Sequence, residues 1–112
     1  QVSEASPHRL VQMLMEGALD RMAQAKGAMA RGDIAQKGLL LGKAIDILIG
    51  LRDGLNPEKT DDPAALQQLD NLYAYMTTRL LEANSKSDVA MIDEVAGLMI
   101  TLKEGWDGIA TL

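Results

Sequence analysis

Apolar residues recur at alternating steps of three and four in four separate stretches of the chain. An average spacing near 3.5 residues places such side chains on one face of an α-helix. Good helix formers such as Leu, Ala and Met are frequent, and Phe is absent, so the composition favours the same structure. The pattern predicts an all-α fold. The repeat is most regular in the first and last stretches, where it runs through Val11, Met15, Ala18, Met22, Ala25 and Met29, and through Ile92, Val95, Met99, Leu102, Trp106 and Ile109.

Residues that start and stop helices stand between these stretches. Ser6-Pro7 and Asp62-Pro63 each place a capping side chain before a proline at the first helical position, and Gly32-Asp33 combines a stop with the next cap. Because the connections are short, consecutive helices must fold back beside one another. We predict one domain, an antiparallel up-down-up-down four-helix bundle over 7–112 behind a short N-terminal arm, 1–6, with helices at about 7–30, 33–54, 63–84 and 88–107.

The charge and composition exclude several classes of protein. A net charge of -5, with 11 basic and 16 acidic residues, does not suit the neutralisation of nucleic-acid phosphates. The chain has no cysteine, which removes disulfides and thiolate chemistry. No apolar stretch approaches the roughly 20 residues that span a bilayer. We expect a cytoplasmic protein that binds no nucleic acid and does not insert into the membrane.

Catalytic and metal-binding patterns are also missing from the sequence. A di-metal bundle needs two Glu-x-x-His pairs, whereas His8 is the single histidine. The sequence therefore predicts no catalytic residues, no metal, no cofactor and no enzyme. A histidine on a bundle helix can accept a phosphoryl group, and this alternative stays open for His8. The competing interpretation is an exposed side chain near a frayed helix end.

Two of the predicted helices carry more apolar surface than a bundle core uses. At 100° per residue the apolar arcs of 7–30 and 63–84 cover roughly 120°, an ordinary core-facing stripe that needs no partner. The arcs of 33–54 and 88–107 cover about 200°. Since exposed apolar area marks partner sites, these two helices are predicted to bind another protein. The candidate contacts are Leu40, Ile47, Ile49, Leu51, Val89, Ala96 and Ile100.

Two other arrangements would also account for this surplus. The bundle could form a homo-oligomer without a client, or the arm and the 55–62 connection could cover the surplus. Glycines within the helical periods, including Gly38, Gly42, Gly50 and Gly54, fit either close approach by a partner or close packing inside the bundle. Of the methionines, Met13 is expected to be exposed.

The order and spacing of several short motifs resemble one known family. They are Ala5-Ser6-Pro7, Gly32-Asp33, Leu51-Arg52, the run from Leu69 to Met76 (LDNLYAYM), Arg79-Leu80, Ala83-Asn84, Glu94-Val95 and Trp106. Taken together, they are similar to those of the FliS-type flagellin export chaperones, and the resemblance covers nearly the whole chain.

The resemblance implies a cytosolic, non-enzymatic chaperone. Such a protein would bind the disordered C-terminal segment of flagellin, prevent premature polymerisation and deliver the subunit to the flagellar type III export apparatus. A contact with the export-gate membrane protein is implied for the client-bound form. Physically, this is recognition of amphipathic helices in an apolar groove.

Overall fold

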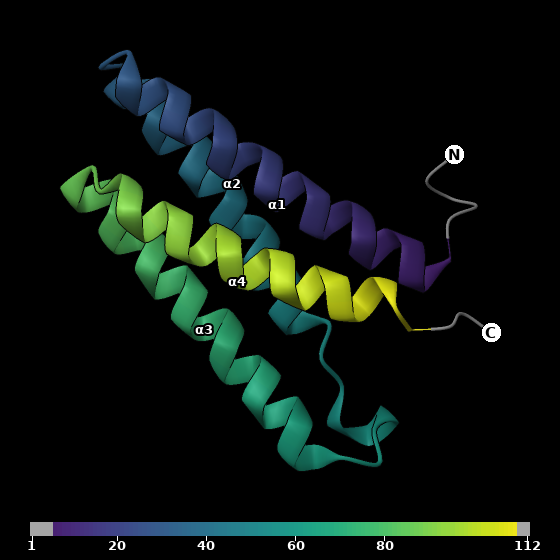
Figure 1. Ribbon diagram of the computed structural model, residues 1–112. Coiled ribbons are helices and arrows are strands. Elements are labelled where there is room, and N and C mark those ends of the chain that lie inside the picture. The colour runs from purple at the N-terminus through teal and green to yellow at the C-terminus, as the bar shows by residue number, and fades with distance from the viewer. Residues whose placement is uncertain (1–5, 110–112) are drawn as a thin grey trace.

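The computed structural model describes residues 6–109, and these residues are helical throughout except for short connections (Figure 1). The prediction of an all-α fold is confirmed. The helix ends lie within two residues of the predicted ones, and the largest difference is at the end of the third helix. Of the predicted arm, residues 1–5 lie outside the described residues. The elements are α1 (Pro7–Ala30), α2 (Ile34–Asp53), the single-turn 3₁₀ helix η2 (Pro57–Lys59), α3 (Pro63–Lys86) and α4 (Val89–Asp107).

Each α-helix begins at a side chain that accepts a hydrogen bond from a backbone N–H of the first turn. Such a cap satisfies one of the four N–H groups that have no partner inside the helix. The proline at the first position of α1 and of α3 costs no hydrogen bond there. The caps are Ser6, Asp33, Asp62 and Asp88, which accept from the N–H groups of Arg9, Gln36, Ala65 and Met91.

The α1–α2 and α3–α4 turns share the same backbone geometry. At the end of α1, Gly32 adopts φ +72°, and the N–H of Asp33 donates to the carbonyl of Ala28 at 2.9 Å. At the end of α3, Ser87 adopts φ 50°, and the N–H of Asp88 donates to the carbonyl of Ala83 at 3.0 Å. In both turns the residue that closes the first helix also caps the next, so the chain reverses within two or three residues.

Side-chain contacts between helices show that neighbours are antiparallel. Each helix packs against two others, α1 and α3 both contacting α2 and α4. Along α1–α4 and along α2–α3 the contacts run in opposite order, and Figure 1 shows the chain reversing direction from each helix to the next. The pairs that fix the order are Gln12 with Asp107, Glu16 with Lys103 and Lys26 with Asp93 between α1 and α4, and Arg52 with Asp70 and Lys37 with Asn84 between α2 and α3.

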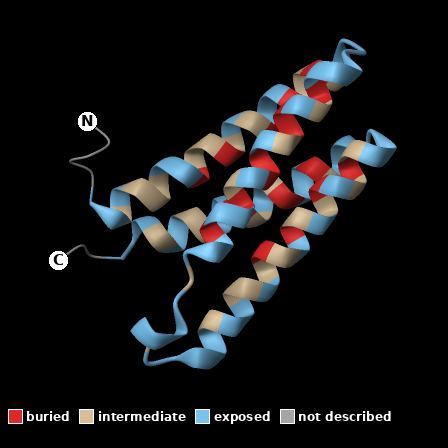
Figure 2. Cartoon of the chain, turned by 180° about the vertical axis from the view of Figure 1, so that it is seen from behind, coloured by how far each residue is buried: buried red, intermediate tan, exposed pale blue. Residues whose placement is uncertain are grey.

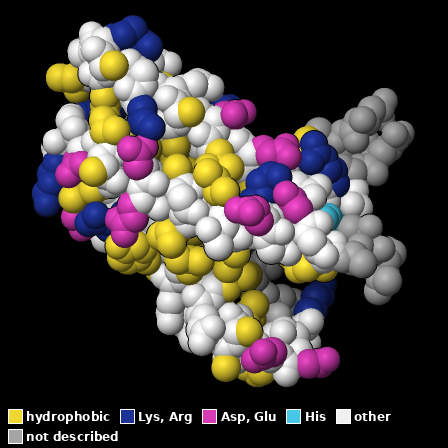
Figure 3. Space-filling model, in the orientation of Figure 1, with side chains coloured by type: hydrophobic (Ala, Val, Ile, Leu, Met, Phe, Trp, Pro, Cys, Tyr) yellow, Lys and Arg dark blue, Asp and Glu magenta, His cyan; other side chains and the backbone are white. Residues whose placement is uncertain are grey.

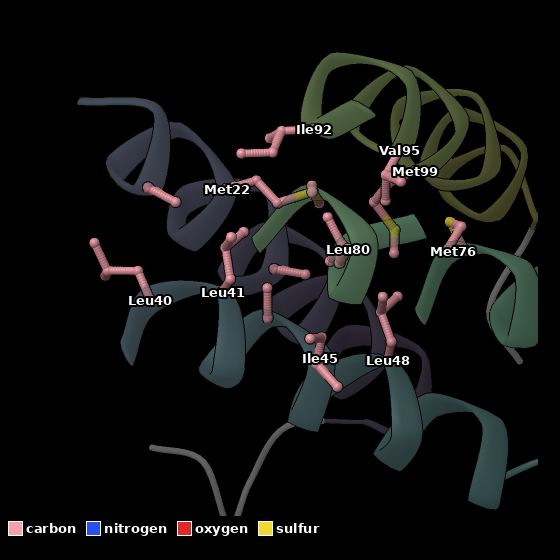
Figure 4. Close-up of a cluster of buried hydrophobic side chains, with 14 of the residues drawn as sticks. Met22, Leu40, Leu41, Ile45, Leu48, Met76, Leu80, Ile92, Val95 and Met99 are labelled. Carbon is pink, nitrogen blue, oxygen red and sulfur yellow. The ribbon is translucent and has the colours of Figure 1, made fainter. Parts of the chain in front are cut away.

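The hydrophobic core lies off centre, toward the end with the two hairpin turns, which we term the closed end. The buried stripe starts at Met15 in α1 and at Tyr73 in α3, and it stops at Met99 in α4. Figure 2 shows the buried residues concentrated in that half. Aliphatic and methionine side chains from all four helices meet there (Figure 4). The opposite half, which we term the open end, comprises residues 7–14, 50–72 and 100–109.

One lysine is buried at the closed end. Lys37 of α2 is 5% exposed, and its ammonium donates to the carbonyl of Asn84 at 2.9 Å and to the hydroxyl of Ser87 at 2.7 Å. These acceptors lie at the C-terminus of α3, where the helix dipole favours a cation. Lys37 therefore fastens the α3–α4 turn to α2.

Candidate binding groove at the open end

Two adjoining cavities open between the helices at the open end. The first has a volume of about 250 Å³ and receives side chains from all four helices. The second, of about 590 Å³, lies between α3 and α4. They share Leu69, Leu102 and Trp106, so we treat them as one feature, the open-end groove. Its other lining residues are Val11, Leu14, Met15, Gly50, Leu51, Gly54, Leu55 and Tyr73 in the first cavity, and Leu72, Leu98, Thr101, Gly105 and Ile109 in the second.

The groove is almost entirely apolar. Hydrophobic side chains gather along the gap between α4 and the lower part of α3 in Figure 3, next to a band of charged side chains over α1 and α4. Leu14 is 41% exposed and Ile109 53% exposed. An apolar hollow with exposed leucine and isoleucine on its margins has the character of a partner site.

The groove corrects the expectation that the apolar stripe of 63–84 is an ordinary core-facing one over its full length. Leu66, Leu69 and Leu72 lie on the core-facing stripe of α3 but remain only half-buried. Figure 1 shows why, because the first half of α3 diverges from the other helices. The width of an apolar arc predicts burial only where the neighbouring helix lies within packing distance over the full length. The 54–62 connection lets α3 begin away from α1 and α4.

Two glycines form part of the groove wall within helices. A Cβ added at Gly50 of α2 or Gly105 of α4 would meet no described atom within 4 Å. Close packing inside the bundle therefore does not account for these two glycines. It does fit Gly17, where an added Cβ would lie 3.5 Å from Cδ1 of Ile47. At Gly50 and Gly105 the missing side chains leave room in the groove.

A histidine and a tryptophan join α1 to α4 beside the groove. Nε2 of His8 lies 2.8 Å from the carbonyl oxygen of Trp106, and since a carbonyl can only accept, Nε2 carries the proton. The indole N–H of Trp106 donates to the carbonyl of His8 at 3.0 Å. The two rings stack with centroids 4.9 Å apart and planes 13° from parallel.

This contact corrects the expectation that His8 is an exposed residue at a frayed helix end. The ring is half-buried, because α4 extends far enough to pair with the first turn of α1. A phosphoryl group on Nε2 would have to displace the hydrogen bond to Trp106. The geometry disfavours phosphotransfer at Nε2.

Ion pairs lie along two margins of the groove. Between α1 and α4, Asp107 accepts from Lys103 at 2.7 Å and from Gln12 at 2.7 Å. The hydrogen bond from Lys103 lowers the pKa of Asp107 and raises the pKa of Lys103. Between α2 and α3, the hydrogen bond from Arg52 lowers the pKa of Asp70. These charges border an apolar channel without entering it.

The sequence-predicted contact residues do not form one surface. Leu40 and Leu51 are buried in the core, at 4% and 7% exposed. Of the seven candidates, Leu51 alone lines the groove. Ile47 is half-buried and faces Gly17 of α1. Ile49 is 44% exposed.

The three candidates on α4 lie on its side toward α1. Extending the order of the α1–α4 contacts places Ala96 across from Ala23 and Ile100 across from Leu19. Ile100 is 48% exposed and Ala96 is half-buried. Val89 lines a separate cavity of about 360 Å³ at the closed end.

Most groove residues were not identified from the sequence, although two signals pointed to them. The 55–62 segment is the longest polar break, so it is the place where a helix can diverge. Gly50, Gly54 and Gly105 all fall at the same end of the bundle. Together these signals would have drawn attention to the apolar residues of 63–72.

The described residues contain no group of three or more His, Cys, Asp or Glu side chains arranged to hold a metal ion. Over that same part of the chain, none of the helices combines the length and the hydropathy that crossing a membrane requires.

Comparison with known proteins identifies the family. The model of the family described as Flagellar protein FliS matches residues 1–112. Flagellar secretion chaperone FliSB of Pseudomonas aeruginosa is 53% identical over 110 residues, covering 98% of this chain and 86% of that protein. Flagellar secretion chaperone FliS of Vibrio cholerae is 47% identical over 109 residues, covering 97% and 79%. The Salmonella typhimurium protein of the same name is 42% identical over 110 residues, covering 97% and 80%.

These names describe chaperones, which are not enzymes, in agreement with the prediction of a non-catalytic protein. The family model and the relatives also confirm the resemblance found in the sequence motifs. The chain belongs to the FliS family of flagellar secretion chaperones.

Proposed function

We propose that the chain binds the disordered C-terminal segment of flagellin, prevents its premature polymerisation and delivers it to the flagellar type III export apparatus. The observation that carries this proposal is the open-end groove, an apolar channel to which all four helices contribute. Membership of a family of flagellar secretion chaperones supports a flagellar client.

Recognition rests on apolar contact. An amphipathic helix of the client lays its apolar side chains against Leu69, Leu102 and Trp106, and Gly50 and Gly105 give them depth. The client orders on binding, and that entropic cost has to be offset by a large contact area. The groove therefore serves as the main contact and the outer faces add to it.

The outer α1–α4 face is proposed as the second contact. Ile100 stands on this face between two ion pairs, Glu16 with Lys103 and Lys26 with Asp93. Ile47 and Ile49, both partly exposed on α2, are proposed as further contacts apart from this face. A client held in this way is kept from packing with other flagellin molecules.

We place the complex in the cytoplasm, where newly made flagellin is available. The export-gate membrane protein of the flagellar apparatus is proposed as the partner that receives it, in the client-bound state. The alternative of a homo-oligomer without a client uses the same groove, because a second copy could cover it.

The decisive experiment is a titration of the protein with a synthetic peptide carrying the C-terminal segment of flagellin, followed by circular dichroism and calorimetry. Leu14→Glu and Ile109→Glu place a charge at exposed positions of the groove, where the cost to folding is small. Both should reduce affinity at least tenfold, since a carboxylate would have to be desolvated against the client. Ile100→Glu tests the outer face and should have a smaller effect.

Matched controls lie outside the groove. Leu39 and Leu81 are each 54% exposed, so Leu39→Glu and Leu81→Glu change the charge equally without entering the groove. They should bind the peptide as the wild type does. Equal losses in all variants would overturn the assignment of the groove. A wild-type protein that sediments as a dimer and does not bind the peptide would favour the homo-oligomer.

A further inference from the structure

The contact between His8 and Trp106 lies at the point where the two cavities of the groove meet. Trp106 lines both cavities, and His8 lines neither. The imidazole stacks on the indole at 4.9 Å between centroids. One face of the indole is thus covered from the α1 side, and the rest of the ring remains available to the groove.

In this contact each ring N–H donates to the backbone carbonyl of the other residue. The indole N–H donates to the carbonyl of His8 at 3.0 Å, and the imidazole Nε2–H donates to the carbonyl of Trp106 at 2.8 Å. An indole nitrogen is a donor only, so an indole turned away from His8 would expose an unpaired N–H to an apolar channel. The groove therefore stays apolar at Trp106 only while the indole keeps this orientation.

Few other contacts join the first turn of α1 to the last turn of α4. The first turn of α1 and the last turn of α4 precede and follow the buried core, which begins at Met15 and stops at Met99. The neighbouring tie, Gln12 with Asp107, is exposed, and exposed polar pairs contribute little rigidity. The stacked and doubly hydrogen-bonded pair is the best-defined contact at this point of the molecule.

We propose that His8 is a positioning residue for client binding, which holds the indole of Trp106 in the orientation that makes the groove one continuous apolar channel. This inference rests on the proposed function. His8 acts without touching the client, and Trp106 is the residue that the client meets.

The first test uses the free protein. Trp106 is the only tryptophan of the chain, so its fluorescence reports on this site alone. His8→Ala removes the stack and the Nε2 donor. Its emission should shift to longer wavelength and its quenching by acrylamide should increase, because the indole gains contact with water. Unchanged emission and quenching in His8→Ala would overturn the proposal.

The second test measures affinity for the flagellin C-terminal peptide by calorimetry. His8→Ala should weaken binding about tenfold, the order of effect expected for losing a hydrogen bond and the orientation it fixes. His8→Gln is the rescue variant, because its planar amide can donate an N–H to the same carbonyl and lie flat on the indole. It should bind within about threefold of the wild type.

Loss of general stability is controlled with a variant at the other end of the bundle. Lys37→Met removes two hydrogen bonds at the closed end and does not alter the groove. If Lys37→Met lowers affinity as much as His8→Ala does, the positioning role is wrong. If the wild type does not bind the peptide while His8→Ala still shifts the emission, the positioning of Trp106 holds and the proposed function fails.

Discussion

Arg52 of α2 donates two hydrogen bonds to the carboxylate of Asp70 of α3, from Nε to Oδ1 at 2.6 Å and from Nη2 to Oδ2 at 3.1 Å. The pair stands one turn before Tyr73, the first buried residue of α3. It therefore ties the two helices where α3 starts to diverge. Paired geometry of this kind orients as well as attracts.

Asp70→Asn should slightly lower thermal stability at neutral pH, since an exposed ion pair contributes little. The hydrogen bond from Arg52 lowers the pKa of Asp70 from its ordinary value of 3.8. A lowered pKa in the folded state means that the contribution is present above pH 3.8 and disappears as the pH falls through the lowered value. Melting curves of both proteins between pH 7 and pH 2 should converge at the acid end. A difference in melting temperature that stays constant with pH would show that the carboxylate charge is not involved.

Lys37→Met should destabilise the fold by about 1–3 kcal/mol, because two hydrogen bonds from a charged donor are lost while the apolar part of the side chain is kept. Equilibrium unfolding in urea measures this effect. Ser87→Ala removes only one of the two acceptors and should cost less. Equal stability of Lys37→Met and the wild type would mean that burying the ammonium costs as much as its hydrogen bonds return.

Alanine at two helical glycines should separate stability from binding. Neither Gly42 nor Gly50 has a described atom within 4 Å of the position of an added Cβ, so Gly42→Ala and Gly50→Ala should each stabilise the fold by about 0.5–1 kcal/mol. Only Gly50 lines the groove. Urea unfolding and peptide titration should show a matched gain in stability but weaker binding for Gly50→Ala alone. Unimpaired binding by this variant would remove Gly50 from the contact.

The two tyrosines should titrate at high pH. Burial raises the pKa of Tyr73 to about 12, and the hydrogen bond to Glu94 raises the pKa of Tyr75. Unfolded tyrosine ionises near pH 10, so the stability from Tyr73 is complete below pH 10 and is lost as the pH rises toward 12. Absorbance of the phenolate at 295 nm measures the titration, and Tyr73→Phe should remove the later step. If the step that Tyr73→Phe removes lies at the ordinary value in the folded protein, the burial of Tyr73 is contradicted.

Sequence periodicity and capping chemistry predicted the architecture because both act locally. Ser6, Asp33 and Asp62 stop or start a helix through atoms only three residues away, and the apolar steps of three and four identify one face without reference to the rest of the fold. Even Met13, which lies opposite that face in α1, is exposed as predicted, at 37%.

The open-end groove was harder to predict because it depends on how the helices diverge. The arc of α3 was assigned to the core, yet Leu69 and Leu72 lie in the groove, since their burial depends on the distance to α4 and not on the sequence of α3. Leu40 shows the opposite case: it lies within the wide arc of α2 but belongs to the core, at 4% exposed, because neighbouring helices cover it. The partner of His8 is likewise a property of helix length and register.

The order in which the chain is synthesised bears on the groove. Each hairpin closes through a turn of two or three residues, so α1 pairs with α2 and α3 with α4 over short stretches of sequence, and contacts of this kind form early in folding. His8 and Trp106, in contrast, are 98 positions apart. A chain that lacks α4 would therefore lack the groove, to which all four helices contribute, and the proposed binding of a client would require the last helix in place.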